Sequence, residues 1–221
     1  MAKCRFIFFD VGNTLLFPNR ARILAPLATE RHPTLERWQA LERRTKQEFD
    51  AGMMGGKVDH SFWWTFHTYL LQELNALDDG VRDALVENTQ NSANWDQILP
   101  GTREALERIR QQYPIAVISN ADGRIDAVLG RCGICDCFSS ITDSGNVGHE
   151  KPHPAIFAAA LREMKADPAE SLYVGDVYSV DYIGARKAGM DAVLFDVSGA
   201  YRQRGLPRVE SLVELEDWLT K

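Results

Sequence analysis

The stretch RFIFFDVGNT at residues 5–14 decides the fold. Its first half is an unbroken apolar run, and such a run without polar alternation is typical of a strand buried on both faces of a parallel sheet. Asp10 ends the run after a few residues, so the run is too short for the apolar core of a signal peptide. Because ligands bind beyond the carboxyl ends of the strands in open α/β sheets, Asp10 is the first candidate functional residue.

Four further short apolar runs are spread along the rest of the chain, at 115–119, 140–142, 172–175 and 192–195. Helical patterns of apolar residues lie between and after them, over 102–112, over 154–165 and behind a capping box that begins at Ser211. Strands that alternate with helices in this way predict βαβ units. The sequence therefore predicts an α/β fold with a doubly wound parallel sheet.

The stretch from 18 to 95 has a different character. Its pattern is helical, it contains no convincing strand, and it holds four of the five tryptophans: Trp38, Trp63, Trp64 and Trp95. It interrupts the chain between the first predicted strand and the next strand–helix unit. We therefore expect a core domain formed by residues 1–17 and 96–221, and an α-helical cap subdomain inserted over residues 18–95.

Composition narrows the classes of function. The chain has 221 residues, 45% of them hydrophobic, and a formal net charge of −6. A nucleic-acid partner would require a basic face, which this sequence does not offer. No apolar run approaches the roughly 20 residues that span a membrane. We expect a cytoplasmic protein that binds neither nucleic acid nor membrane, and the sequence leaves the oligomeric state open.

Polar residues follow each of the first four predicted strands. They are Asp10 to Thr14 after the first, Ser119 and Asn120 after the second, Lys151 and Pro152 a little beyond the third, and Gly175, Asp176 and Asp181 after the fourth. Each residue alone is a weak signal, because an aspartate after a strand is most often a helix cap or a turn former. Together they would bring a carboxylate, a hydroxyl, a lysine and an acidic pair to one edge of the sheet.

In this order the residues resemble the motifs of the haloacid dehalogenase superfamily. The first motif of that family, Asp-x-Asp-x-Thr behind an apolar strand, matches Asp10 and Thr14. Its strand that ends in Ser or Thr matches Ser119, its Lys-Pro matches Lys151, and its Gly-Asp with a second Asp matches Asp176 and Asp181. The resemblance covers nearly the whole chain, and residues 18–95 lie where that family carries a helical cap.

The resemblance implies a hydrolase, in which Asp10 attacks phosphorus and forms an aspartyl-phosphate. It implies Mg²⁺ as cofactor, held by the carboxylates of Asp10 and Asp176 and by the backbone carbonyl of Gly12. Asp181 is implied to orient water molecules or the lysine. The implied substrate is a small phosphorylated molecule, a phosphate ester or an acyl phosphate.

The same resemblance implies a phosphate-binding set. Ser119 is implied to donate a hydrogen bond to a phosphoryl oxygen, together with the backbone amide of Asn120. Lys151 is implied to offset negative charge on the phosphoryl group and on Asp10, so that Asp10, Ser119 and Lys151 form the catalytic set.

Position 12 departs from the pattern of the phosphatases in this family, which carry a second aspartate there. Gly12 spares the carbonyl ligand but removes general acid/base assistance, which typically contributes about 10²–10⁴ in rate. Turnover is therefore expected to be slow, most of all for alkyl phosphates. Asp122 and His60 are candidates for a substitute acid. A structural explanation is a backbone with positive φ at residue 12, which glycine tolerates.

Three other functions remain open at this stage. A binding or regulatory protein would keep the fold without efficient turnover. A 2-haloacid dehalogenase needs no acid, because halide leaves without a proton, but that branch has an aromatic residue at position 12 and needs no metal. A phosphonate hydrolase has a small residue there and a cap lysine that forms an imine. The cap lysines Lys46 and Lys57 are interpreted here as surface charges.

Overall fold

The computed structural model describes residues 4–54 and 62–220. Its centre is a six-stranded sheet in the order β3-β2-β1-β4-β5-β6, in which every neighbouring pair is parallel. The strands are β1 (Phe6–Phe9), β2 (Ile115–Ser119), β3 (Ser140–Asp143), β4 (Ser171–Gly175), β5 (Asp191–Phe195) and β6 (Arg208–Val209). The predicted doubly wound α/β sheet is confirmed. The sixth strand was not predicted, because two residues are too short to show a period.

Alternating residues of β1 face two separate cores. Ile7 and Phe9 belong to one, and Phe8 belongs to the other, and all three are fully buried. Helices α5 (Thr102–Arg110), α6 (Ile125–Arg131) and α10 (Leu212–Leu219) contribute to the first core, while α8 (Pro154–Met164) and α9 (Ile183–Lys187) contribute to the second. Short α7 (Ser144–Val147) follows β3. The unbroken apolar run of the first strand is therefore explained by burial on both faces.

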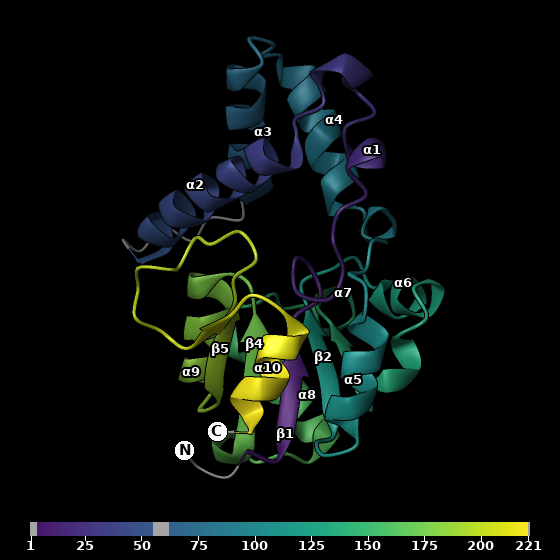
Figure 1. Cartoon of the computed structure of the whole chain (residues 1–221), viewed down its shortest axis with the longest axis vertical. Helices are drawn as coiled ribbons and strands as arrows, with labels where there is room; N and C mark the ends of the chain where they lie inside the picture. Colours follow the sequence, from purple (N-terminus) through teal and green to yellow (C-terminus); the bar gives the residue numbers. More distant parts are fainter. Residues whose placement is uncertain (1–3, 55–61, 221) are drawn as a thin grey trace.

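Four helices lie together beyond one end of the sheet (Figure 1): α1 (Arg20–Ile23), α2 (Leu35–Met54), α3 (Phe62–Glu73) and α4 (Asp79–Gln90). They have a core of their own, in which the Trp38 and Phe66 rings lie 4.6 Å apart. No strand occurs in the described part of residues 18–95. We call residues 18–95 the cap segment; its boundaries at 17/18 and 95/96 stay a prediction.

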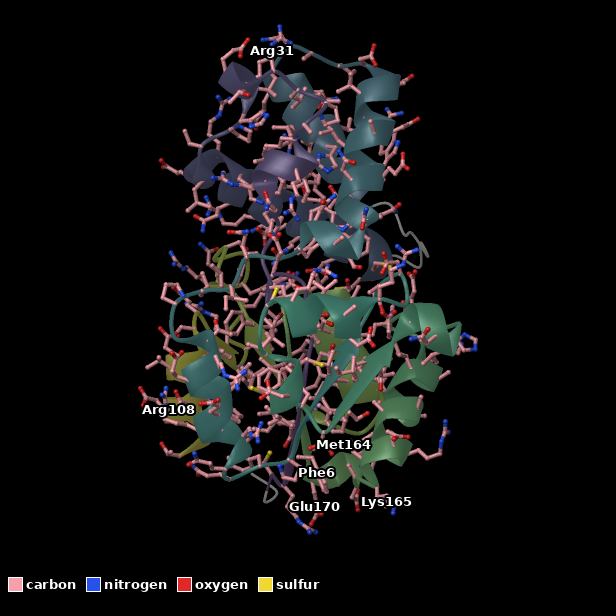
Figure 2. All side chains as sticks on the ribbon, turned by 90° about the vertical axis from the view of Figure 1, so that its right-hand side faces the viewer. Phe6, Arg31, Arg108, Met164, Lys165 and Glu170 are labelled. Carbon is pink, nitrogen blue, oxygen red and sulfur yellow. The ribbon has the colours of Figure 1, made fainter. Side chains whose placement is uncertain are left out.

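The molecule is elongated from the cap segment to the far edge of the sheet. Figure 2 shows Arg31 at the outer end of the cap segment, and Phe6, Lys165 and Glu170 at the opposite end of the molecule. The chain enters and leaves the cap segment side by side, because Phe17 and Gln97 exchange backbone hydrogen bonds of 2.7 and 3.2 Å. No helix formed by residues 4–54 or 62–220 combines the length and apolar character of a membrane span.

Candidate functional site

Asp10 follows β1 directly, in the middle of the sheet. Phe9 pairs with Val117 of β2 and with Val174 of β4, and the Asp10 amide donates to the Val174 carbonyl at 2.8 Å. This register brings Asp10 to the carboxyl edge of the sheet, where Ser119 ends β2 and Asp176 follows β4. The predicted convergence of strand-end residues is therefore present in the structure.

Lys151 reaches this edge from the loop before α8. Its ammonium donates to Asp10 Oδ1 at 2.6 Å, to the Tyr173 hydroxyl at 2.7 Å and to Asp181 Oδ1 at 2.8 Å. All four side chains are buried. Burial alone would lower the pKa of Lys151, but the Asp10 and Asp181 carboxylates raise it well above its usual value. The lysine therefore stays charged beside the candidate nucleophile.

Asn120 fixes the backbone of that lysine. Its side-chain oxygen accepts from the Lys151 amide at 2.7 Å, and its side-chain nitrogen donates to the Lys151 carbonyl at 3.0 Å. Such a pair of reciprocal bonds satisfies both polar groups of one peptide position. The Asn120 side chain thus positions Lys151, whereas the predicted contacts of the Asn120 amide and of Ser119 with phosphate stay predictions.

Asp181 is held against the end of β4 by a π-helical turn, η5 (Tyr178–Tyr182). Its Oδ2 accepts from the Val177 amide at 2.9 Å. A Cβ at Gly175 would lie 2.6 Å from Asp181 Cγ, closer than real contacts allow, so any larger residue here would force Asp181 to shift. The Gly-Asp pair after the fourth strand is therefore explained by the close approach of the second aspartate.

Asp176 is paired with a residue of the cap segment. Lys46 of α2 lies 2.8 Å from Asp176 Oδ2 and 2.7 Å from Glu42 Oε1, measured from its Nζ. Its side chain is only 1% exposed. The interpretation of Lys46 as a surface charge is therefore wrong. Sequence reasoning missed the contact because the residues lie 130 positions apart in the chain and only the packing of α2 brings them together.

The part of α2 around Lys46 is docked on the sheet by several polar contacts. Asp50 accepts from the Ser179 amide at 2.9 Å and from the Tyr201 hydroxyl at 3.0 Å, and Arg43 donates to the Ser198 carbonyl at 2.9 Å. Figure 1 shows this end of α2 beside the loop that leads from β5 to β6. Lys46 is thus part of a built interface between the cap segment and the sheet.

The carboxylates of Asp10, Asp176 and Asp181 form the cluster suited to a metal ion. One oxygen from each lies within 4.8 Å of the others. Burial raises the pKa of Asp10 to about 6 and that of Asp176 to about 7, against the lowering influence of the neighbouring lysines. Because burial is the main cause of these shifts, a further cation nearby would favour the carboxylate forms of Asp10 and Asp176.

The charges of the whole group lead to the same result. The carboxyl groups of Asp10, Asp176, Asp181 and Glu42 meet two ammonium groups, those of Lys46 and Lys151, which leaves an excess of two negative charges when all are ionised. A hard dication that prefers oxygen ligands would balance this excess. The residues fit a site for Mg²⁺, and ligation by the Gly12 carbonyl stays a prediction.

Gly12 has an ordinary backbone conformation. The positive φ in this loop belongs to Asn13, at 53°, so the structural explanation for glycine at position 12 is wrong. A Cβ at Gly12 would lie 3.5 Å from Cζ3 of Trp95, an ordinary van der Waals contact. The indole therefore lies against the side of Gly12 from which a side chain would project.

Trp95 is held in place from the cap segment. Its Nε1 donates to the Thr89 carbonyl at 2.7 Å. The Trp63 ring packs edge-on against the indole of Trp95, with 5.5 Å between the ring centroids. Asp122, a candidate substitute acid, accepts from the Ser92 amide at 3.3 Å. The other candidate acid, His60, and the second cap lysine, Lys57, lie outside the described residues.

Sequence reasoning missed four residues of the site: Tyr173, Glu42, Lys46 as a site residue and Trp95. Tyr173 had a usable signal, because a tyrosine inside a buried strand requires a partner for its hydroxyl. The other three are contributed by the cap segment, whose approach to the sheet no local pattern specifies.

Comparisons with known proteins agree on one family. The haloacid dehalogenase-like hydrolases match residues 4–189 of the chain. The human haloacid dehalogenase-like hydrolase domain-containing protein 3 is 31% identical over 213 residues, which cover 87% of this chain and 82% of that protein. The ribulose-1,5-bisphosphate 5-phosphatase of Halopiger xanaduensis is 29% identical over 211 residues, covering 87% of this chain and 84% of that protein.

Solved structures show the same fold. A magnesium-bound haloacid dehalogenase-type hydrolase from Bacillus subtilis superposes with a TM-score of 0.72 at 19% identity, covering 99% of this chain and 100% of that chain. A 2-haloacid dehalogenase from Pseudomonas syringae superposes with a TM-score of 0.58 at 24% identity, covering 98% of each chain. At such identities the likeness concerns the fold alone.

Proposed function

Because the chain belongs to the haloacid dehalogenase-like hydrolases, we propose that it is a Mg²⁺-dependent phosphatase that transfers the phosphoryl group of a small molecule to Asp10. The observation that carries this proposal is the Asp10 carboxylate, buried beside Lys151 at 2.6 Å and within 4.8 Å of two further carboxylates. A phosphatase with a named sugar bisphosphate substrate among the relatives supports phosphate esters as the substrate class.

The reaction has two steps. An oxygen of Asp10 forms a bond to phosphorus while the bond to the leaving oxygen breaks, and the leaving oxygen takes a proton from water, which gives an aspartyl-phosphate, an alcohol or acid, and hydroxide. Hydroxide then attacks phosphorus, the bond to Asp10 breaks, and hydrogen phosphate is released with the Asp10 carboxylate restored. Lys151 keeps its positive charge through both steps and stabilises negative charge on Asp10 and on the transferred group.

Asp10, Asp176 and the Gly12 carbonyl would hold Mg²⁺, which neutralises phosphate charge when bound. The Ser119 hydroxyl and the Asn120 amide would bind phosphoryl oxygens. Asp181 would keep Lys151 in place through their 2.8 Å contact, and the Asn120 side chain does so from the other side. The residues at the carboxyl edge of the sheet would thus bind the phosphoryl group, and Asp10 among them would attack phosphorus.

A phosphonate hydrolase is the alternative that gains most from the buried Lys46. An imine forms from a neutral amine, however, and Lys46 lies between the carboxylates of Asp176 and Glu42. This pairing favours the ammonium form and so favours a phosphatase. A 2-haloacid dehalogenase would not require the acidic pair Asp176 and Asp181.

The test uses p-nitrophenyl phosphate with purified protein and Mg²⁺. We expect phosphate release that EDTA abolishes and Mg²⁺ restores, and that Asp10→Asn lowers at least about 10³-fold. Mass spectrometry of the quenched protein should show a phosphoryl adduct on Asp10. Halide release from 2-chloropropionate without metal would contradict this proposal and would identify the protein as a dehalogenase. Absence of any turnover together with intact Mg²⁺ binding would support a binding protein.

A further inference from the structure

We propose that Lys46 is a catalytic residue contributed by the cap segment, which donates a hydrogen bond to the leaving-group oxygen of the substrate. This inference rests on the proposed phosphatase function and extends it to the side of the site that faces the cap segment. It assigns to an ammonium group the stabilisation of leaving-group charge that no side chain at position 12 can supply.

The position of Lys46 is the first argument. Its ammonium lies 2.8 Å from Asp176, whose carboxylate lies within 4.8 Å of Asp10. Lys151 contacts Asp10 from the core, so the two lysines approach the carboxylate cluster from different parts of the fold. A substrate that is bound between the cap segment and Asp10 would therefore meet one cation on each side.

The docking of α2 is the second argument. Asp50, one turn beyond Lys46 on the same helix, accepts hydrogen bonds from the Ser179 amide and the Tyr201 hydroxyl. Arg43, almost one turn before it, donates to the Ser198 carbonyl. Polar contacts on both sides of Lys46 fix how far its side chain reaches. Such preorganisation is what a transition-state contact requires, because the donor then needs no reorganisation during the reaction.

The loop after β1 supplies the third argument. Gly12 has no side chain, and the indole of Trp95 lies 3.5 Å from the position that a Cβ there would take. Trp95 is braced by Thr89 and Trp63, so this apolar wall is part of the cap segment's structure. Gly12 offers no group for the leaving oxygen, and among the described residues of the cap segment Lys46 is a buried cation paired with the cluster.

A purely structural role explains Lys46 less well. Burying an ammonium is costly, and apolar residues of similar volume often hold such an interface at least as well. A cation bound by Asp176 would compete for the lone pairs that Lys46 now uses, so N–H donors of Lys46 would become available to a bound phosphate ester. The pairing with Glu42 would keep the ammonium at the site meanwhile.

The experiment measures kcat/KM for a series of phosphate monoesters, from p-nitrophenyl phosphate through phenyl phosphate to ethyl phosphate. We expect Lys46→Met to lower kcat/KM about tenfold for the nitrophenyl ester and about 10²–10³-fold for the ethyl ester, the range seen when one oxyanion donor is removed. The dependence of log(kcat/KM) on leaving-group pKa should become steeper. Lys46→Arg should recover part of the loss, because it keeps the charge.

Two matched variants separate this effect from misfolding. Arg44→Met removes a cation from the same helix, at a side chain that is 51% exposed and paired with Glu48, and should leave the slope unchanged. The double variant Lys46→Met with Glu42→Leu also removes the Glu42 carboxylate, which Lys46→Met alone leaves without its cation, and should show the same steep slope with a melting temperature above that of Lys46→Met. Equal losses for all esters in Lys46→Met, or no loss at all, would overturn the proposal.

A binding measurement distinguishes failure of this inference from failure of the phosphatase proposal. Phenyl phosphate is titrated by calorimetry into Asp10→Asn and into Asp10→Asn with Lys46→Met, with Mg²⁺ present. We expect the second protein to bind at least about tenfold more weakly, a factor of the size that one charged hydrogen bond contributes. If the unmodified protein hydrolyses no ester, the phosphatase proposal fails. Equal affinities of the two proteins in this titration would overturn the Lys46 contact, whatever the outcome for hydrolysis.

Discussion

The two lysines of the site are bound to carboxylates at similar distances, yet they are positioned in different ways. Lys151 lies within the sheet domain, where strand ends and the Asn120 side chain fix it against Asp10 and Asp181. Lys46 arrives on a helix of the cap segment and meets Asp176 across an interface. The first contact forms whenever the sheet folds, whereas the second forms only while the cap segment is docked.

This difference has an energetic consequence. A buried charge that loses its partner is costly because it cannot reach water. At Lys151 the unpaired carboxylates would remain inside the core. At Lys46 we expect a smaller cost, limited by the free energy of undocking the cap segment, because undocking would expose Asp176 to solvent.

Removing each lysine tests the comparison most strongly. We expect Lys151→Met to lower the free energy of unfolding by about 3–5 kcal/mol, because Asp10 and Asp181 keep their burial and lose their cation. Lys46→Met should lower the free energy of unfolding by less, when both variants are measured by urea titration. It should instead accelerate amide hydrogen exchange in α2, while exchange in β1 and β4 stays unchanged. Equal losses for the two variants would contradict the distinction between core and interface.

The same division explains what could be predicted from the sequence. The apolar run before Asp10 is a local pattern, and parallel pairing then dictates that Ser119 and Asp176 end at the same edge, so the core half of the site was predictable. Lys46 was not, because α2 carries buried Glu42, Lys46 and Asp50 on the face that docks on the sheet. Such a pattern looks like a solvated helix face until the partner surface is known.

Acid pH should weaken the cap segment before the core. His67 of α3 is fully buried, and burial lowers its pKa to about 3. Because the unfolded pKa is near 6.5, the stability from neutral His67 is present above that value and falls as the pH drops toward 3. At pH 5 the loss is about 2 kcal/mol, from roughly 1.5 pH units at 1.36 kcal/mol each.

The buried carboxylates act in the opposite direction. Asp10 and Asp176 have pKa values of about 6 and 7, above their usual range, so their contribution to stability is present at low pH and is lost as the pH rises through those values. Urea unfolding without metal at pH 7.5 and pH 5, followed by the fluorescence of the tryptophans, measures the sum of both effects, and the difference between the unmodified protein and His67→Gln isolates the histidine. On going from pH 7.5 to pH 5, the free energy of unfolding of His67→Gln should rise by about 2 kcal/mol relative to that of the unmodified protein, and an identical pH dependence of the two proteins would refute the assignment to His67.

The hydroxyl of Tyr201 should adjust the docking of α2. It donates to Asp50 Oδ2 at 3.0 Å and accepts from the Tyr178 amide at 3.0 Å, and Tyr201→Phe removes both bonds while it keeps the ring in the core. A bond to a carboxylate contributes about 1.5–3 kcal/mol, so the undocked fraction should rise at least tenfold. Hydrogen exchange in α2 reports this change. Tyr182→Phe, in the same aromatic cluster, is the control and should leave the exchange rates as they are.

The smallest effect is expected at the two glycines that flank the nucleophile in space. Gly12 has no positive φ, and a Cβ there would make an ordinary 3.5 Å contact with Trp95. Gly12→Ala should therefore stabilise the protein by about 0.5 kcal/mol, because alanine reduces the entropy of the unfolded chain.

Gly175→Ala is the matched contrast, since its Cβ would lie 2.6 Å from Asp181 Cγ, and we expect it to destabilise by about 1–3 kcal/mol. Urea titration of both variants decides the point. Destabilisation by Gly12→Ala would mean that the backbone requires glycine at position 12. Stabilisation would mean that the loop after β1 accommodates a Cβ at position 12 in contact with Trp95.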